Sequence, residues 1–176
     1  AALCGGRVRV IRLNPQTLQG DIGFVRILED LGCSVSAGDS WVEVAGRELP
    51  SGERAFDMGD MPDTVPTLAV LSALRPGRTV IRNVAHLRVK ESNRLEALVR
   101  ELKKVGIGAA ETTDGLTIEG GRPRGAEIET YDDHRIAMSF AVLGLVVGGI
   151  RIRDRACVGK SFPGFWEEMG RLYRRP

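Results

Sequence analysis

Gly77-Arg-Thr-Val-Ile-Arg82 decides how this chain folds, because close copies of it stand at Gly6-Arg-Val-Arg-Val-Ile-Arg12 and Gly149-Ile-Arg-Ile-Arg153. The three leading glycines are 71 and 72 residues apart. Apolar residues alternate within each copy, which is typical of a β-strand with one buried face. A period of this length indicates a structure built from repeated units.

A helix and then a hairpin are expected after each of the first two copies. The helices begin at about Asp21 and at about Glu91, and Gly32 and Gly106 end them, as glycine commonly does. The second hairpin turns at Asp114-Gly115. Its strands and those of the first hairpin are expected over 34–36, 41–45, 109–112 and 116–119.

Two further helices, over 63–74 and 134–147, are apolar nearly all round, as buried helices are. The elements together give a repeated β-α-β-α-β-β unit with helices inside and sheets outside, an inside-out α/β barrel-like domain of the α/β or α+β class. The repeats would span about 6–76 and 77–148, with an incomplete third over 149–176 that closes on a helix after Ser161-Phe162-Pro163. We therefore expect a single domain over 1–176.

The composition sets limits on the partners. The 176 residues are 43% hydrophobic and 27% charged, which suits a packed domain, and a net charge of +2 with 5% aromatic residues gives no reason to expect nucleic-acid binding. The longest apolar stretch, around 141–147, is shorter than the roughly 20 residues that span a bilayer. Cys4, Cys33 and Cys157 have no metal-ligand spacing, so we expect reduced cysteines and the cytoplasm.

Charged residues gather where the expected helices begin. Lys90, Glu91 and Arg94 stand at the start of the second amphipathic helix, and His134 and Arg135 open a buried one. A helix N-terminus presents unpaired N–H groups and the positive end of the helix dipole, so cations added there favour binding of phosphate or carboxylate. A surface ion pair between Glu91 and Arg94 is the alternative.

Asp63 stands at the start of the other buried helix, and three interpretations of it are open. It can cap that helix, a common role of aspartate. It can join Asp57 and Asp60 in a metal site, although neither histidine nor EF-hand glycine spacing accompanies them. It can also act as a general base toward a substrate hydroxyl.

Lys160 follows a stretch similar to the end of a phosphate-binding loop, but Asp154 stands where that motif needs glycine, so the Walker interpretation fails. Lys160 is then either a solvated lysine or an anion ligand. Asp63, the 90–94 run, the 134–135 pair and Lys160 all precede or open a helix of the repeat. Parallel helices would bring them to one face that attracts a phosphorylated or carboxylated small molecule.

Five motifs, in this order, resemble those in the C-terminal part of the 5-enolpyruvylshikimate 3-phosphate synthase family. They are Gln19-Gly20-Asp21, Met61-Pro62-Asp63, Arg88-Val-Lys90-Glu91-Ser-Asn-Arg94, Asp133-His134-Arg135-Ile-Ala-Met138 and Lys160-Ser-Phe162-Pro163. The resemblance runs from Gly6 to the C-terminal helix. It implies the enolpyruvyl transferase fold, in which two domains of three repeats close around the substrates, and it implies that this chain is the C-terminal domain, with half of the active site.

The resemblance also implies the reaction, which is carboxyvinyl transfer from phosphoenolpyruvate to the 5-hydroxyl of shikimate 3-phosphate with release of phosphate. This step belongs to the shikimate pathway of aromatic amino acid biosynthesis, and glyphosate inhibits its enzymes. Asp63 would accept the hydroxyl proton and Glu91 would help to protonate the methylene carbon. Binding is implied for Lys90 and His86 toward shikimate 3-phosphate, for Arg94, Arg135 and Lys160 toward phosphoenolpyruvate, and for His134 at the same place. No metal or organic cofactor is implied.

Two alternatives stay open. One is a related transferase that acts on a UDP-sugar, against which Lys90-Glu91-Ser92 and Asp133-His134-Arg135 argue; the other is a non-catalytic anion-binding module. The implied partners are the two substrates and the N-terminal domain of the same enzyme, without nucleic acid or membrane, in a monomeric full-length form. The isolated chain is expected to be inactive or weakly active, and residues from the extreme N-terminus of the whole protein would close the third repeat.

Overall fold

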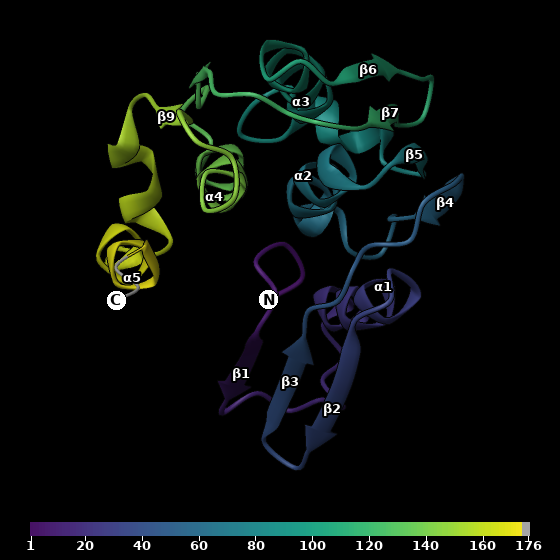
Figure 1. Ribbon diagram of the computed structural model, residues 1–176, viewed down its shortest axis with the longest axis vertical. Helices are drawn as coiled ribbons and strands as arrows, with labels where there is room; N and C mark the ends of the chain where they lie inside the picture. Colours follow the sequence, from purple (N-terminus) through teal and green to yellow (C-terminus); the bar gives the residue numbers. More distant parts are fainter. Residues whose placement is uncertain (174–176) are drawn as a thin grey trace.

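The computed structural model describes residues 1–173, and its three sheets lie around the contacting helices α2 and α4 (Figure 1). The sheets have the strand orders β1-β3-β2, β4-β5-β7-β6 and β8-β9. The strands are β1 (Arg7–Ile11), β2 (Ser34–Gly38), β3 (Trp41–Ala45), β4 (Arg54–Asp57), β5 (Gly77–Arg82), β6 (Gly108–Glu111), β7 (Leu116–Gly120), β8 (Glu127–Ile128) and β9 (Arg151–Ile152). The helices are α1 (Phe24–Asp30), α2 (Val65–Leu74), α3 (Arg94–Lys104), α4 (His134–Leu143) and α5 (Phe165–Tyr173), with 3-10 helices η1 (Gly20–Gly23), η2 (Pro62–Thr64), η3 (Ala85–Val89) and η4 (Arg155–Lys160).

The backbone repeats with the period that the sequence predicts. Each strand copy follows a glycine with positive φ: Gly6, Gly77 and Gly149 have φ of 77°, 111° and 81°. A non-glycine residue in the left-handed region ends the first copy and directly follows each of the other two, and these residues are Arg12, Asn83 and Asp154, with φ of 59°, 62° and 47°. Left-handed backbone is uncommon outside glycine, so its recurrence at corresponding positions confirms the repeat as a structural one.

Two short strands, β4 and β8, lie outside the predicted elements. Each runs parallel to a strand copy: β4 pairs with β5, placing Phe56 opposite Ile81, and β8 pairs with β9. Four residues and two residues are too short for an alternating pattern to identify them. With β4 included, residues 54–120 have the predicted order β-α-β-α-β-β, as β4-α2-β5-α3-β6-β7, but this stretch crosses the predicted boundary between the repeats 6–76 and 77–148. The α/β class is confirmed.

Four helix boundaries differ from the prediction. The helix expected over 63–74 starts as η2 and becomes α-helical only at Val65. The helix expected from about Asp21 starts as η1 and becomes α-helical only at Phe24. The helix expected from about Glu91 begins at Arg94, because the side chain of Asn93 accepts a hydrogen bond from the Glu96 N–H and caps it there. Lys90 is therefore in the preceding loop rather than one helical turn from Arg94. The helix expected over 134–147 ends at Leu143, after which the chain continues in turns.

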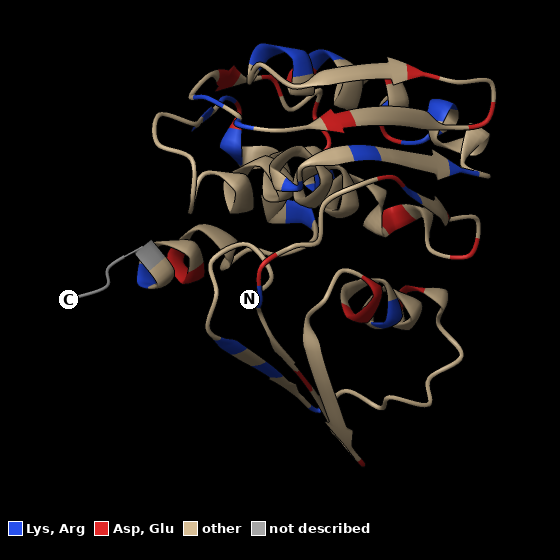
Figure 2. Cartoon of the chain, turned by 45° about the vertical axis from the view of Figure 1, so that its right-hand side comes forward, with Lys and Arg blue, Asp and Glu red and all other residues tan. Residues whose placement is uncertain are grey.

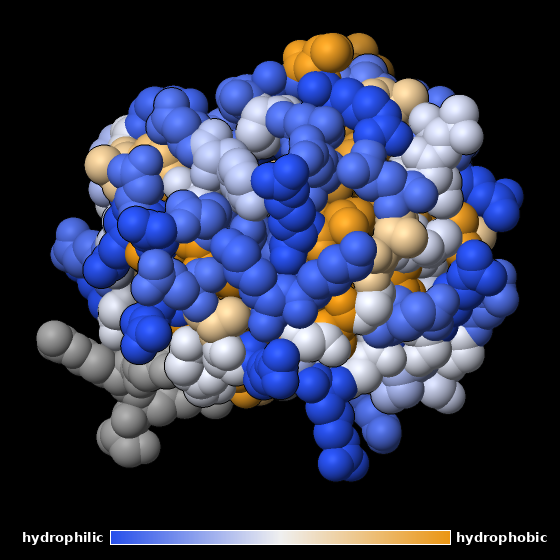
Figure 3. All heavy atoms as spheres, turned by 90° about the horizontal axis from the view of Figure 1, so that it is seen from above, coloured by the Kyte–Doolittle hydropathy of each residue, from blue (hydrophilic) through white to orange (hydrophobic). Residues whose placement is uncertain are grey.

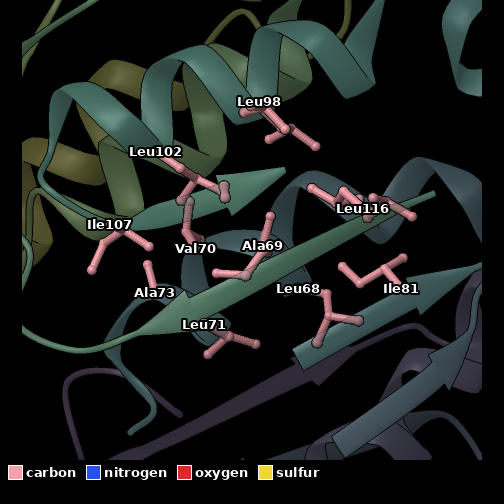
Figure 4. Close-up of a cluster of buried hydrophobic side chains, with 14 of the residues drawn as sticks. Leu68, Ala69, Val70, Leu71, Ala73, Ile81, Leu98, Leu102, Ile107 and Leu116 are labelled. Carbon is pink, nitrogen blue, oxygen red and sulfur yellow. The ribbon is translucent and has the colours of Figure 1, made fainter. Parts of the chain in front are cut away.

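The helix α2 is buried along almost its whole length, as its uniformly apolar sequence predicts. Figure 4 shows Leu68 and Ala69 between the sheet and α3, where Ile81 and Leu116 face them from the strands and Leu98 from the helix. A helix packed on all sides is held by burial of apolar surface, which stabilises by about 25 cal/mol for each Å² removed from water. The loops that enter α2, α3 and α4 are therefore attached to a rigid centre.

Charged residues of both signs stand on the same elements (Figure 2). Acidic and basic residues are interspersed over the elements (Figure 2), and hydrophilic side chains cover most of the face seen from above (Figure 3). Within residues 1–173, no helix has both the length and the apolar character that crossing a membrane requires.

Candidate active site

Arg94, the first residue of α3, is at the centre of a group of charged side chains. Its guanidinium forms ion pairs with three carboxylates: Nη1 lies 2.9 Å from Oδ1 of Asp63, Nη2 lies 2.7 Å from Oε2 of Glu91, and Nε lies 2.8 Å from Oδ2 of Asp133. The Arg94 side chain has 0% exposure. A guanidinium out of contact with water needs such counterions, since an unpaired buried charge is costly.

Asp63 joins this group to Arg135. The η2 turn before α2 carries Asp63, and its Oδ2 lies 2.6 Å from Nη2 of Arg135, while Nη1 of Arg135 donates to the Asp63 carbonyl at 3.2 Å. The capping interpretation of Asp63 is wrong, because Thr64 stands at the N-cap of α2 and no side-chain bond caps that helix. We call Asp63, Glu91, Arg94, Asp133 and Arg135 the Arg94 cluster.

The carboxylate of Asp63 does not share a metal site with Asp57. Asp57 instead accepts hydrogen bonds from Nδ2 of Asn83 at 3.1 Å and from the Gly59 N–H at 3.0 Å. Among residues 1–173, no three histidine, cysteine or acidic side chains are placed to hold a metal ion together. The interpretation of the 57–63 acidic run as a metal site is therefore not supported.

Asp133 is the buried acid of the cluster, with 0% side-chain exposure. It caps α4 by accepting from the Arg135 N–H at 2.9 Å, and it also accepts from Oγ of Ser92 at 3.0 Å. Burial by itself would raise the pKa of Asp133, but the hydrogen bonds and charge of Arg94 hold the pKa below its ordinary value. Burial likewise opposes the charge of Arg94, yet Asp133 and Asp63 raise the pKa of that guanidinium. The pair is therefore ionised at neutral pH.

His134 and Lys160 flank the cluster. His134 is 8% exposed, burial lowers its pKa, and its Nδ1 makes no hydrogen bond to any described residue. Nε of Arg135 is also buried without a partner among residues 1–173. Lys160, the last residue of η4, donates from Nζ to the Asp132 carbonyl at 3.2 Å. Buried polar atoms without partners are uncommon and mark places where a ligand or water completes the hydrogen bonding.

Lys90 and His86 are less closely tied to the cluster. Lys90 is exposed in the loop beside Glu91, and His86 is exposed within η3. In the described chain, neither side chain forms a hydrogen bond or ion pair with the cluster. Their contacts with substrate stay predictions.

The Gln19-Gly20-Asp21 motif lies against the turn that carries Asp63. Helices η1 and η2 are in contact, and a Cβ at position 20 would overlap the carbonyl oxygen of Asp60, so only glycine fits. A cavity of about 490 Å³ lined in part by Gln19, Asp60 and Met61 opens beside the turn. The first helix start thus joins the others on this side of the domain.

The predicted convergence is confirmed, but the charge of the site differs from the expectation. Ion pairs join four of the predicted residues into one group: Asp63, Glu91, Arg94 and Arg135. Lys160 is linked to this group through its hydrogen bond to the carbonyl of Asp132. Three carboxylates against two guanidiniums leave the cluster with one net negative charge, whereas the sequence predicts a face rich in free cations. An anion can reach Arg94 only by displacing Glu91 or Asp63, its partly exposed partners.

Asp133 is not one of the predicted site residues, although the motif that begins with it is one of the five that support the family resemblance. The signal available in the sequence is an aspartate immediately before a uniformly apolar helix, which predicts a cap and no more. Its pairing with Arg94 joins positions 39 residues apart, and local patterns carry no information on such a contact.

Comparisons with known proteins show the family of this chain. The family model described as EPSP synthase (3-phosphoshikimate 1-carboxyvinyltransferase) matches residues 1–169. The 3-phosphoshikimate 1-carboxyvinyltransferases of Syntrophobacter fumaroxidans and Methanoculleus marisnigri are 51% and 48% identical to this chain, over 98% and 96% of it. The matches cover 41% and 40% of those relatives, so the chain spans about two fifths of their length.

Solved structures give the same result. EPSP synthase from Acinetobacter baumannii is 31% identical, with a TM-score of 0.81 over 96% of this chain and 42% of that one. The enolpyruvyl transferase NikO from Streptomyces tendae is 22% identical, with a TM-score of 0.74 over 98% of this chain and 40% of that one, and this likeness concerns the fold alone.

Proposed function

This chain belongs to the EPSP synthase family, and on that premise we propose that it is the C-terminal domain of an enzyme that transfers the carboxyvinyl group of phosphoenolpyruvate to shikimate 3-phosphate. The observation that carries the proposal is the meeting of Asp63, Glu91, Arg94 and Arg135 in one ion-paired cluster. Two carboxylates held by two guanidiniums provide both proton-transfer groups and anion ligands at one place.

In the proposed reaction, the 5-hydroxyl oxygen of shikimate 3-phosphate attacks C2 of phosphoenolpyruvate. Asp63 takes the hydroxyl proton, and Glu91 helps to deliver a proton to C3, so that a tetrahedral adduct forms. Loss of a proton from C3 and cleavage of the C2–O bond to phosphate then regenerate the vinyl group and release phosphate. Holding both substrates in this geometry removes most of the entropic cost of their encounter.

The ion pairs of Asp63 suggest how substrate binding would free this carboxylate for proton transfer. Arg135 and Arg94 now donate to Asp63, at 2.6 and 2.9 Å. A phosphate or carboxylate of phosphoenolpyruvate would compete for those donors, with Lys160 adding charge. The Asp63 carboxylate would then be released from Arg94 and Arg135, and its oxygens would be free to accept the hydroxyl proton when substrate is present.

The remaining substrate contacts are proposed as the family resemblance implies them. Lys90 is a free cation beside Glu91, and we assign it to shikimate 3-phosphate together with His86. His134, neutral because burial lowers its pKa, offers an unused ring nitrogen to either substrate.

The proposal includes a second domain, because the relatives are more than twice as long as this chain. An N-terminal domain would close over the Arg94 cluster and supply further cations, and the complete enzyme would act as a monomer in the cytoplasm. Residues 1–176 would form the one domain, with the third repeat completed by residues from the extreme N-terminus of the whole protein.

Titration of the chain with phosphoenolpyruvate and with shikimate 3-phosphate, followed by amide chemical shifts, tests the proposal. We expect weak binding of both, with shifts at Asp63, Arg135 and Lys160. Addition of the N-terminal domain of a close relative is expected to restore turnover. Binding of neither substrate would instead favour a non-catalytic module.

A further inference from the structure

The turn that leads into Asp133 has an unusual backbone. Tyr131 and Asp132 are consecutive non-glycine residues in the left-handed region, each with φ of 55°. Side chains disfavour this conformation, and two adjacent instances persist only where surrounding contacts impose them. Contacts outside the turn must therefore hold it.

Glu101 of α3 provides those contacts. Its carboxylate is fully buried and accepts hydrogen bonds from the Tyr131 hydroxyl at 2.6 Å and from the Glu129 N–H at 3.2 Å. Lys104 lies 2.9 Å from the same carboxylate and balances its charge. Burial and the neighbouring Glu101 raise the pKa of Tyr131, so its hydroxyl stays protonated and remains a donor. Hydrogen bonds to an ionised acceptor are about twice as strong as neutral ones.

Two residues of helix α3 bind the turn and the residue that follows it. Arg94 and Glu101 are seven residues apart, which puts them on one face of the helix and about 10 Å apart along its axis. Arg94 binds Asp133 after the turn, and Glu101 binds Tyr131 within it. Asp132 contributes through its carbonyl, which accepts from Nζ of Lys160. Movement of the turn would displace both Asp133 and the partner of Lys160.

We propose that Glu101 and Tyr131 are positioning residues of the active site, whose hydrogen bond holds the strained turn so that Asp133 meets Arg94 and Asp132 meets Lys160. Among residues 1–173, neither residue forms a side-chain hydrogen bond or an ion pair with the Arg94 cluster. The identity of the ligand rests on the proposed function, whereas the positioning of the turn rests on the contacts alone.

The variant Tyr131→Phe tests this, because it removes one hydroxyl and keeps the ring. In the 176-residue chain, we expect hydrogen exchange at the Asp133 and Arg135 amides to accelerate on the order of tenfold, and the dissociation constant for phosphoenolpyruvate to rise by a similar factor. Lys103→Met is the matched control: it changes an exposed lysine of the same helix whose side chain forms no hydrogen bond or ion pair with the turn in the described chain, and both quantities should stay unchanged.

Ile118→Val separates positioning from loss of stability, since it removes one carbon from a fully buried core side chain of β7, outside the turn. Its exchange rates are expected to change across the domain rather than at the turn. The proposal would be overturned if the amides of Asp133 and Arg135 exchanged at the same rate in Tyr131→Phe as in the original chain. It would also be overturned if Tyr131→Phe accelerated exchange across the whole domain, as is expected for Ile118→Val. If phosphoenolpyruvate does not bind the original chain, the proposed function fails, while the exchange comparison still decides the positioning role.

Discussion

Arg94 and Asp133 form an ion pair in which neither side chain has any exposed surface, with 2.8 Å between Nε and Oδ2. The pair joins the first residue of α3 to the residue that caps α4, so it links two helices as well as two charges. Each charge alone would be buried without compensation, and the structure depends on both being present.

Asp133→Ala is expected to destabilise the domain by about 3–5 kcal/mol, because it leaves Arg94 buried with only its two partly exposed partners and removes the cap of α4. Urea unfolding followed by circular dichroism measures the change. Glu168→Ala, which removes an exposed ion pair with Arg171, is the control and should change stability by less than about 0.5 kcal/mol. An equal effect of the two variants would contradict the importance of the buried pair.

The same pair predicts how stability depends on pH. The pKa of Asp133 is lower in the folded chain than the unfolded value of about 3.9, so the unfolded state binds more protons between the two values. The contribution of Asp133 to the free energy of unfolding is fully present above about pH 5, and it is lost as the pH falls through the pKa of Asp133 in the folded chain. Urea unfolding from pH 6 to pH 2 should show a steeper loss for the original chain than for Asp133→Asn; equal slopes would mean that Asp133 is not the group responsible.

Asp63→Ala is expected to separate binding from turnover. The variant frees one donor of Arg94 and one of Arg135 from a competing carboxylate, so phosphoenolpyruvate should bind the chain about tenfold more tightly. Under the proposed function, turnover after addition of the N-terminal domain of a relative should be lost, because Asp63 is the proposed proton acceptor. Calorimetric titration and a phosphate-release assay measure the two effects. Asp57→Ala, whose carboxylate bonds Asn83 and Gly59, is the control and should change neither; weaker binding in Asp63→Ala would argue against competition.

Gly77→Ala is expected to destabilise the domain by more than about 2 kcal/mol. Residue 77 has φ of 111°, and an added Cβ would overlap the backbone of Gly52. Gly170→Ala in α5 is the opposite case, since nothing lies within 4 Å of the added atom and alanine favours helix, so stability should rise by about 0.5–1 kcal/mol. Thermal unfolding of the two variants provides the comparison, and a tolerated alanine at 77 would show that the repeat does not need its leading glycine.

Local sequence patterns are sufficient to predict much of the fold. The strand copies led by Gly6, Gly77 and Gly149, and the uniformly apolar α2, are visible in the sequence because periodicity and glycine placement record burial and backbone conformation directly. The same holds for the helix starts that carry Asp63, Arg94 and Arg135. Very short elements cannot be predicted in this way, because they contain too few residues to form a pattern. The strand β8 has two residues, and it is a strand only because it pairs with the parallel strand β9.

The sequence by itself determined that a repeated α/β domain places acids and bases at the starts of its helices. Only the tertiary structure decided that three carboxylates surround one buried arginine, that Asp133 rather than solvent neutralises it, and that Glu101 holds the turn beside it. The physical reason is distance along the chain: Arg94 meets Asp63 across 31 positions and Asp133 across 39, and such contacts exist only after the helices have packed, since burial then makes each charge require its partner.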